Sequence, residues 1–363
     1  MAGKSGKSMH EDTFKMEKNV SITDIAKCVN VDPSTVSLAL NNSPRIAEKT
    51  RSRIQEIARA MGYTPNYFAK GLRGRKTKSI GLIVRSLRDQ FYVDLLSSME
   101  CWLGDHQYSS LLEVTRENSA AQAVDELLER RVDGLAGSGF SQDIECLHKL
   151  ADLARNGKPL ALYVYTSHLK LFENVNVDLV TCDLHQGCYE MTRHLLELGH
   201  RRIAFVGGGP GKKTKGYKKA FEEYGIKPDP MLLVEYAYRY QDVSHICHKL
   251  MAPKDPPTAI FAYTDDLAAA LIKELIKNGY DVPEDVSVAG INDNWHSQML
   301  RLPLTTIRIP TEEIGETLVK MLVERIEKPS LPQRVRQFKT ELIKRDSTVS
   351  LRARKDLSYV SIK

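Results

Sequence analysis

Residues 22–41, ITDIAKCVNVDPSTVSLALN, predict two short helices joined by a tight turn. Ser21 and Asp24 form a Ser-x-x-Asp capping signal at the start of the first helix. Asp32 then stands where the second helix needs an N-cap, and Pro33 follows at its first helical position. These signals predict a helical hairpin whose two helices have well-defined starts.

Small hydroxyl side chains gather near the start of the second helix, at Ser34, Thr35 and Ser37. In a helix-turn-helix that reads DNA, this end of the second helix reaches base edges in the major groove. An ordinary helical hairpin is the alternative, and such hairpins are common. A third amphipathic helix is expected at 48–61, stopped by Gly62, and its presence favours the helix-turn-helix.

Positive charge is concentrated near the N-terminus. Residues 1–78 hold 15 Lys and Arg against 7 Asp and Glu, whereas the remainder of the 363 residues holds 37 against 39. A basic segment attached to a near-neutral body is the electrostatic pattern of a nucleic-acid module joined to another domain. A solvated charged face would explain any one cluster, but not an asymmetry confined to one segment.

Other features argue against membrane, secreted, metal-binding and catalytic classes. No run of 18 apolar residues is present, and residues 1–19 lack the apolar segment of an export signal, so a cytoplasmic protein is expected. The six cysteines show no metal-ligand spacing, which predicts reduced thiols and no metal site. The sequence contains no nucleophile elbow, HExxH or P-loop, so neither an enzyme nor a cofactor is expected.

From Ser79 onward, short apolar runs alternate with helical patterns, and the alternation restarts near Arg202. Such alternation predicts parallel sheets covered on both faces. Two doubly wound lobes in one chain would leave a cleft between the carboxyl ends of their strands, where ligands commonly bind. The expected strands of the first lobe are 80–84, 109–114, 133–138, 160–164 and 180–183.

Several motifs, in order along the chain, resemble the LacI/GalR family of bacterial repressors. They are D-I-A at 24–26, S-T-V-S at 34–37, G-Y-x-P-N-x-x-A-x-x-L at 62–72, R-R-V-D-G-L at 130–135, H-L-L-E-L-G-H-R-R-I-A-F-V-G-G at 194–208 and V-P-E-D-V-S-V-A-G at 282–290. The resemblance extends to about Thr348. It implies an α/β chain with an N-terminal all-α helix-turn-helix headpiece and a periplasmic-binding-protein-like domain of two doubly wound α/β lobes.

The resemblance also implies a domain layout. The chain would cross between the lobes near Arg201, Thr306 and Arg336. No leucine-heptad tail that could assemble a tetramer is found, so a homodimer is expected. The expected segments are a disordered polar tail 1–19, the headpiece 20–65, a hinge helix and linker 66–78, an effector-binding and dimerisation domain 79–348 (lobe 1, 79–201 and 307–335; lobe 2, 202–306 and 336–348) and a tail 349–363.

In the family, a hinge helix follows the headpiece and becomes ordered when two copies meet on operator DNA. Leu72 matches the residue that the family inserts into the minor groove as a wedge. The alternative is that Leu72 is a packed linker residue. Leu38 stands where many members carry Arg or His, so it either contacts a thymine methyl or packs inward. The expected DNA-binding residues are Thr23, Pro33, Ser34, Thr35, Ser37, Leu38, Asn41, Asn66, Ala69, Leu72 and Arg73.

Two residues depart from the family pattern where an effector would bind. Lys213 replaces a usual Arg and Asn292 a usual Asp, which leaves open an atypical or absent effector. Phe91 and Tyr92 either stack on the ligand or anchor the following helix, and Asp183 either faces the cleft or caps a helix. The expected effector-binding residues are Phe91, Tyr92, Asp183, Lys213, Tyr238, Asp265, Asn292 and Asp293.

These features predict a dimeric transcriptional regulator that acts as a repressor and binds palindromic double-stranded operator DNA. A small molecule, most simply a carbohydrate, would control its DNA affinity from the cleft. One alternative is a regulator controlled by a protein partner. Another is a solute-binding protein without regulatory DNA binding, against which the missing export segment and the basic head both argue.

Overall fold

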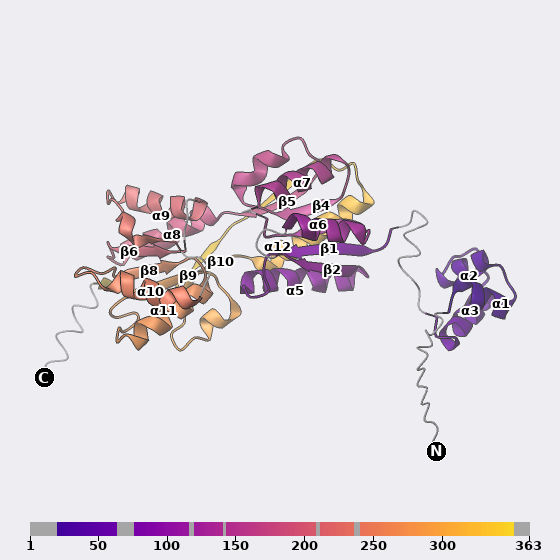
Figure 1. The fold of residues 1–363 in the computed structure, drawn as a ribbon, viewed down its shortest axis with the longest axis horizontal. Coiled ribbons are helices and arrows are strands. Elements are labelled where there is room, and N and C mark those ends of the chain that lie inside the picture. Colours follow the sequence, from indigo (N-terminus) through magenta and orange to yellow (C-terminus); the bar gives the residue numbers. More distant parts are fainter. Residues whose placement is uncertain are drawn as a thin grey trace, which may run out of the picture. The chain divides into compact units, whose positions relative to one another are not determined.

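The computed structural model describes residues 20–63, 76–115, 120–140, 143–207, 211–235 and 240–351. The chain forms two compact units, residues 1–75 and 76–363, each of which is described by itself (Figure 1). Five residues expected at the binding sites lie outside the described residues: Asn66, Ala69, Leu72, Arg73 and Tyr238.

The first unit contains the three expected helices, α1 (Ile22–Val29), α2 (Pro33–Leu40) and α3 (Glu48–Ala60). Both predicted caps are present. The Ser21 amide donates to Asp24 Oδ2 over 2.9 Å, and the Ser34 amide donates to Asp32 Oδ1 over 2.8 Å. The small core of this headpiece consists of Ile25, Ala26, Val36, Ala39, Ile54 and Ala58.

The second unit contains two six-stranded sheets, one in each lobe. The lobe 1 sheet is parallel, and the lobe 2 sheet is parallel except for β12, which runs antiparallel to β10. In spatial order, lobe 1 holds β11 (Arg334–Phe338), β5 (Asp178–Cys182), β4 (Leu160–Tyr163), β3 (Gly134–Gly137), β1 (Ser79–Val84) and β2 (Ser109–Val114). Lobe 2 holds β12 (Glu341–Ile343), β10 (Thr305–Arg308), β9 (Ser287–Asn292), β8 (Ala259–Ala262), β6 (Ile203–Val206) and β7 (Leu233–Val234).

Helices cover both faces of each sheet, as the alternating pattern predicted. The lobe 1 helices are α5 (Gln90–Asp105), α6 (Ala120–Glu129), α7 (Ile144–Arg155) and α12 (Thr311–Glu327). The lobe 2 helices are α8 (Leu184–Glu197), α9 (Lys212–Glu223), α10 (Tyr240–Met251) and α11 (Asp265–Lys277). Short 3-10 helices are η1 (Thr166–Phe172), η2 (Pro230–Leu232) and η3 (Trp295–Gln298). In the part of the chain that the structure describes, no helix is long and apolar enough to cross a membrane.

One hydrophobic cluster continues from lobe 1 into lobe 2. It joins Tyr163 and Cys182 of lobe 1 to Cys188, Phe205 and Tyr217 of lobe 2, and all five side chains are buried. The helices α5 and α12 contribute on one side, and α8 and α9 on the other. The lobes are therefore in apolar contact, in addition to their covalent connections.

The expected position of the first crossing between lobes is wrong. The helix α8 packs closely against α9, β10 and β12, so it belongs to lobe 2 and the crossing lies at Asp183 rather than near Arg201. A Cβ at Gly216 of α9 would collide with the His185 carbonyl oxygen, and the absent side chain therefore permits this close helix pair. The other crossings lie at 309–310 and 339–340, a few residues beyond Thr306 and Arg336.

Candidate DNA-binding and effector-binding sites

The start of α2 is open to solvent, whereas its middle packs into the headpiece. Pro33 and Ser34 are exposed, and Thr35 is half-buried. Val36 and Ala39 are fully buried in the core and fix the orientation of the helix. Asp32 caps this turn by accepting from Ser34, and the exposed Pro33 and Ser34 leave this end of the helix accessible to a partner.

Leu38 lies in the second turn of α2. It is half-buried, and it is not among the described apolar residues that pack against the headpiece core. Both roles expected from the sequence, contact with a thymine methyl and inward packing, therefore stay predictions. The neighbouring Ser37 is also half-buried, and its carbonyl accepts a hydrogen bond from Asn41 Nδ2 over 2.7 Å.

Two contacts hold the ends of the motif in place. Gln55 of α3 donates from Nε2 to the Ala39 carbonyl over 3.1 Å and to Asn42 Oδ1 over 2.8 Å, which fastens the end of α2. At the start of α1, Thr23 is exposed and its hydroxyl accepts a bond from Ser21 Oγ over 3.2 Å. Thr23 and Asn41 thus flank α2 on the headpiece surface.

Five aromatic side chains meet between the lobes. The Phe91 ring lies 5.2 Å from Tyr92 and 5.7 Å from Tyr163, measured between ring centroids. Burial raises the pKa of Tyr163 well above its ordinary value, and the nearby Tyr165, Tyr92 and Tyr263 add to this rise. Because Tyr263 follows β8 of lobe 2 and the other four belong to lobe 1, this aromatic cluster spans both lobes.

Lys213, in the first turn of α9, is buried with 8% of its surface exposed. Its Nζ lies 3.4 Å from the centroid of the Tyr263 ring and donates to the Tyr263 carbonyl oxygen over 3.3 Å. Burial lowers the pKa of Lys213, an effect that Tyr165 and Asp89 of lobe 1 partly offset. The Lys213 side chain is therefore buried against Tyr263 of the same lobe.

Two expected ligand residues prove to have structural roles. Asp183 caps α8, and its Oδ1 accepts the Gln186 amide over 3.1 Å. Asp265 is fully buried, and its carboxylate accepts Thr306 Oγ1 over 2.5 Å and Ser297 Oγ over 2.7 Å. The alternative of a capping role for Asp183 is the one observed, and the expectation that Asp265 contacts an effector is not supported, because its oxygens join β10 and η3.

Asn292 and Asp293 end β9 with two consecutive positive φ angles, 123° and 58°. Asn292 is buried. Asp293 accepts Arg308 Nε over 2.8 Å and Arg345 Nη2 over 2.6 Å, and Arg308 also binds Glu341 over 2.9 Å. Asp293 therefore joins the strand ends beside the second and third crossings, and its expected role as an effector ligand stays a prediction.

Sequence reasoning missed three titratable residues, Asp89, Asp266 and His296. Burial raises the pKa of Asp89 and of Asp266, and each of these groups has a charged neighbour in the other lobe. Asp266 forms an ion pair with His296 Nε2 over 3.2 Å. The tripeptide Thr264-Asp265-Asp266 offered a signal for Asp266, but His296 could be placed only by the fold.

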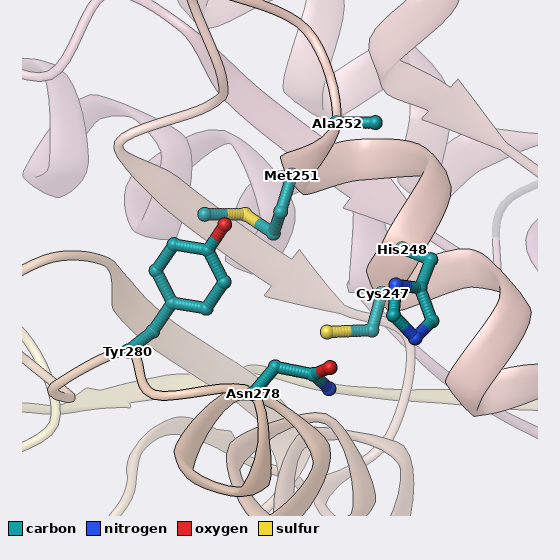
Figure 2. A pocket seen from close by; sticks show the side chains of 6 residues that line it. All are labelled: Cys247, His248, Met251, Ala252, Asn278 and Tyr280. Atoms are coloured by element: carbon teal, nitrogen blue, oxygen red, sulfur yellow. The ribbon is translucent and has the colours of Figure 1, made fainter.

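A separate hollow of about 250 Å³ lies in lobe 2, at the ends of α10 and α11 (Figure 2). Burial raises the pKa of its Cys247 thiol, which makes the reactive thiolate scarce. None of the expected effector residues is in its lining, which consists of Cys247, His248, Met251, Ala252, Asn278 and Tyr280. Among the described residues, no group of three or more His, Cys, Asp or Glu side chains is arranged to hold a metal ion.

Comparison with known families gives two matches. Residues 21–66 match the family described as "Bacterial regulatory proteins, lacI family". Residues 192–348 match the "Periplasmic binding protein-like domain". The first match covers the headpiece helices, and the second begins inside α8 and covers lobe 2 with the returning segments.

Similar proteins agree with this division. The chain is 31% identical over 302 residues to the HTH-type transcriptional regulator DegA of Bacillus subtilis (strain 168), covering 81% of this chain and 88% of that one. It is 29% identical over 342 residues to catabolite control protein A of Priestia megaterium, covering 91% and 99%. A solved LacI family transcriptional regulator from Enterococcus faecium with bound ribose is 26% identical, with a TM-score of 0.65 and coverage of 75% and 99%.

Proposed function

Because the chain belongs to the lacI family of bacterial regulatory proteins, we propose that it is a homodimeric repressor whose operator affinity is set by a small molecule between the lobes. The coarser role follows from the family itself. The chain is a DNA-binding transcriptional regulator with a periplasmic binding protein-like domain of the kind that binds effectors. Its relatives are regulators rather than enzymes. Operator binding in a bacterial cell would take place in the cytoplasm.

The observation that carries the DNA-binding proposal is the exposed start of α2. The core fixes this helix through Val36 and Ala39, and the cap at Asp32 sets its first turn. Ser34 and Thr35 then face the major groove as hydrogen-bonding groups, and Leu38 meets a thymine methyl. Pro33, Ser37, Thr23 and Asn41 complete the headpiece contacts in this proposal.

The hinge is proposed to follow the family pattern. Asn66, Ala69 and Arg73 would lie along the minor groove, and Leu72 would separate a base step there. Such a wedge needs two copies meeting at the centre of a palindrome. Lobe 1 would supply most of the contact between the two copies. The two-fold symmetry of this dimer would match the symmetry of the palindromic operator.

For the effector we propose a sugar or sugar derivative held against the aromatic cluster. Phe91 and Tyr92 would provide ring faces, Lys213 beside Tyr263 would provide one polar group, and Asn292 is proposed as another. A related regulator carries ribose, which supports this class of ligand. A change in the contact between lobes would alter the spacing of the two hinges and hence the fit of the headpieces on DNA.

The test is a binding titration of the full chain on DNA selected from its own genome, across a salt series. Tight, salt-steep binding to a palindrome, changed by one sugar in a panel, supports the whole proposal. Selective binding that no compound alters would retain the regulator and indicate a protein partner as its control. Failure to select any DNA sequence would overturn the DNA-binding proposal and restore the solute-binding alternative.

A further inference from the structure

One edge of the lobe 1 sheet is open in the part of the chain that the structure describes. The strand β11 pairs with β5 on one side, and no described strand lies on its other side. Three consecutive residues, Val335, Arg336 and Gln337, are exposed, and 51% of the surface of the apolar Val335 is accessible. Successive side chains of a strand point to opposite faces, so both faces of β11 leave room for a further strand beside it.

The backbone of β11 directs two residues away from the sheet. The Arg334 amide donates to the residue before β5 over 3.2 Å, and the Phe338 carbonyl oxygen accepts the amide of the residue after β5 over 3.0 Å. In a parallel pair, every second residue of a strand bonds to the same neighbour, so positions 334, 336 and 338 bond towards β5. The N–H and C=O groups of Val335 and Gln337 therefore point outward, where an added strand would bond to them.

Contacts within lobe 1 hold this edge in place. Arg334 Nε donates to the buried Asp178 Oδ1 over 2.7 Å, and its Nη2 donates to the Met321 carbonyl oxygen over 2.8 Å. Gln333 Nε2 donates to the Phe172 carbonyl oxygen over 2.6 Å, just before the strand begins. An edge fixed in this way loses little conformational freedom when a partner strand binds, which favours binding.

The charges around β11 indicate the kind of partner that fits. Residues 328–340 hold four Lys and Arg residues and no Asp or Glu. Three of the four, Lys328, Arg336 and Lys339, are exposed. A second copy of β11 is disfavoured, because two-fold antiparallel pairing about the centre of the strand would bring Arg336 against Arg336. An acidic strand would instead be attracted by the same residues.

We propose that β11 is a docking edge for an extended acidic segment of a partner protein, which adds to the lobe 1 sheet as a further strand. Its apolar residues would cover Val335 on one face, and its acidic residues would pair with Arg336 on the other. This inference goes beyond the proposed function and does not depend on it. It would give the regulator an input that is separate from any small molecule.

The experiment uses the full chain and a fluorescent short peptide that alternates valine and glutamate. Fluorescence anisotropy measures binding, and hydrogen exchange read at single amides locates it. The peptide is expected to bind and to slow exchange of the Val335 and Gln337 amides about tenfold, because these amides gain partners. The Arg336 amide already bonds towards β5 and should change little. A peptide with lysine in place of glutamate should not bind.

Three variants separate the backbone from the charge. Val335→Pro removes an outward N–H but leaves the bonds to β5, since proline is tolerated on an edge strand, and it should weaken peptide binding about tenfold. Val335→Ala keeps that N–H and is the matched control, with a smaller loss. Arg336→Glu should weaken binding of the glutamate peptide about tenfold and strengthen binding of the lysine peptide. Thermal unfolding of each variant checks that lobe 1 remains folded.

Several results would overturn the proposal. No binding of the glutamate peptide at millimolar concentration would leave Arg336 as a charge that only guards the edge against association. Slower exchange elsewhere, with Val335 and Gln337 unchanged, would place the peptide on another surface. Equal affinities of Val335→Pro and Val335→Ala would show that no backbone ladder forms. None of these readouts involves DNA, so their failure leaves the regulator proposal intact, and failure of selective DNA binding leaves them intact.

Discussion

The apolar residue Leu38 stands in α2, the helix that is proposed to bind in the major groove. Leu38 is half-buried and cannot hydrogen-bond to a base edge. We predict that Leu38→Ala weakens binding to the selected operator about fivefold, in line with roughly 1 kcal/mol for one apolar base contact. The slope of log affinity against log salt should stay the same, because no phosphate contact is lost. Fluorescence anisotropy at several salt concentrations measures both quantities, and a reduced slope would contradict this role.

Another prediction at this scale concerns His194 of α8. Burial lowers its pKa to about 4, from an ordinary value of 6.5, and its Nε2 has no hydrogen-bond partner among the residues that the structure describes. A depressed histidine pKa means that the unfolded chain binds the proton more readily, so stability falls as the pH drops from about 6.5 towards 4. The loss between pH 7 and pH 5 is expected to be about 2 kcal/mol.

Urea unfolding of the parent and of His194→Leu at pH 7 and pH 5 isolates this contribution. The variant should lose less stability than the parent over the same pH interval, because Leu does not titrate. Equal losses in both proteins would show that His194 does not supply the pH dependence. Lys344 and Glu197 are the charged groups that influence His194, and both remain in the variant.

Among the elements, β11 and α12 are fastened to β5 by one buried carboxylate. Asp178 accepts Arg325 Nε over 2.8 Å and Arg334 Nε over 2.7 Å, and it is fully buried. We predict that Asp178→Asn lowers the free energy of unfolding by about 3–5 kcal/mol, because it leaves the buried Arg325 charge without its partner. Chemical denaturation followed by circular dichroism measures this change.

An exposed ion pair provides the control for that measurement. Arg193 and Glu197 of α8 lie 3.3 Å apart with about half of each side chain exposed. Glu197→Gln should cost less than about 0.5 kcal/mol, since solvent screens such pairs. A similar cost for Asp178→Asn and Glu197→Gln would show that the buried network does not stabilise lobe 1.

The elements also show what the sequence could predict. The headpiece was predictable because its caps are local, with Ser21 bonding to Asp24 and Asp32 to Ser34. The place of α8 was not, because it depends on the close approach permitted by Gly216 in another helix. At the site, Lys213 was found by its position in a motif. Its contact with Tyr263, 50 residues away, and its burial required the folded chain.

At the scale of the whole molecule, the dimer is the first prediction. The full chain at micromolar concentration should sediment as a homodimer in analytical ultracentrifugation, with no tetramer. A palindromic operator brings two headpieces to one site, so binding to a half-site of the same sequence should be much weaker. A stable monomer or tetramer, or equal affinity for the half-site, would contradict this assembly.

The last prediction joins the interlobe site to the headpieces. If lobe opening changes operator affinity, then operator binding must change lobe opening by the same factor, because coupling between two equilibria is reciprocal. Cys182 ends β5 and is buried in the apolar cluster shared by the lobes, so its alkylation rate reports on lobe opening. We expect saturating operator DNA to change this rate by about fivefold or more, within the usual range of such coupling. Scrambled DNA of equal length should have no effect, and Cys247 should label at one rate throughout.

That factor also limits what Lys213 can do to DNA binding. The variant Lys213→Ala can change operator affinity by no more than the operator changes the opening equilibrium, since a shift in population cannot exceed the difference in affinity between states. An identical Cys182 rate with and without operator would mean that opening and DNA binding are independent. Lobe opening would then be a property of the second unit alone, and control of the headpieces would have to come from contact between the two copies.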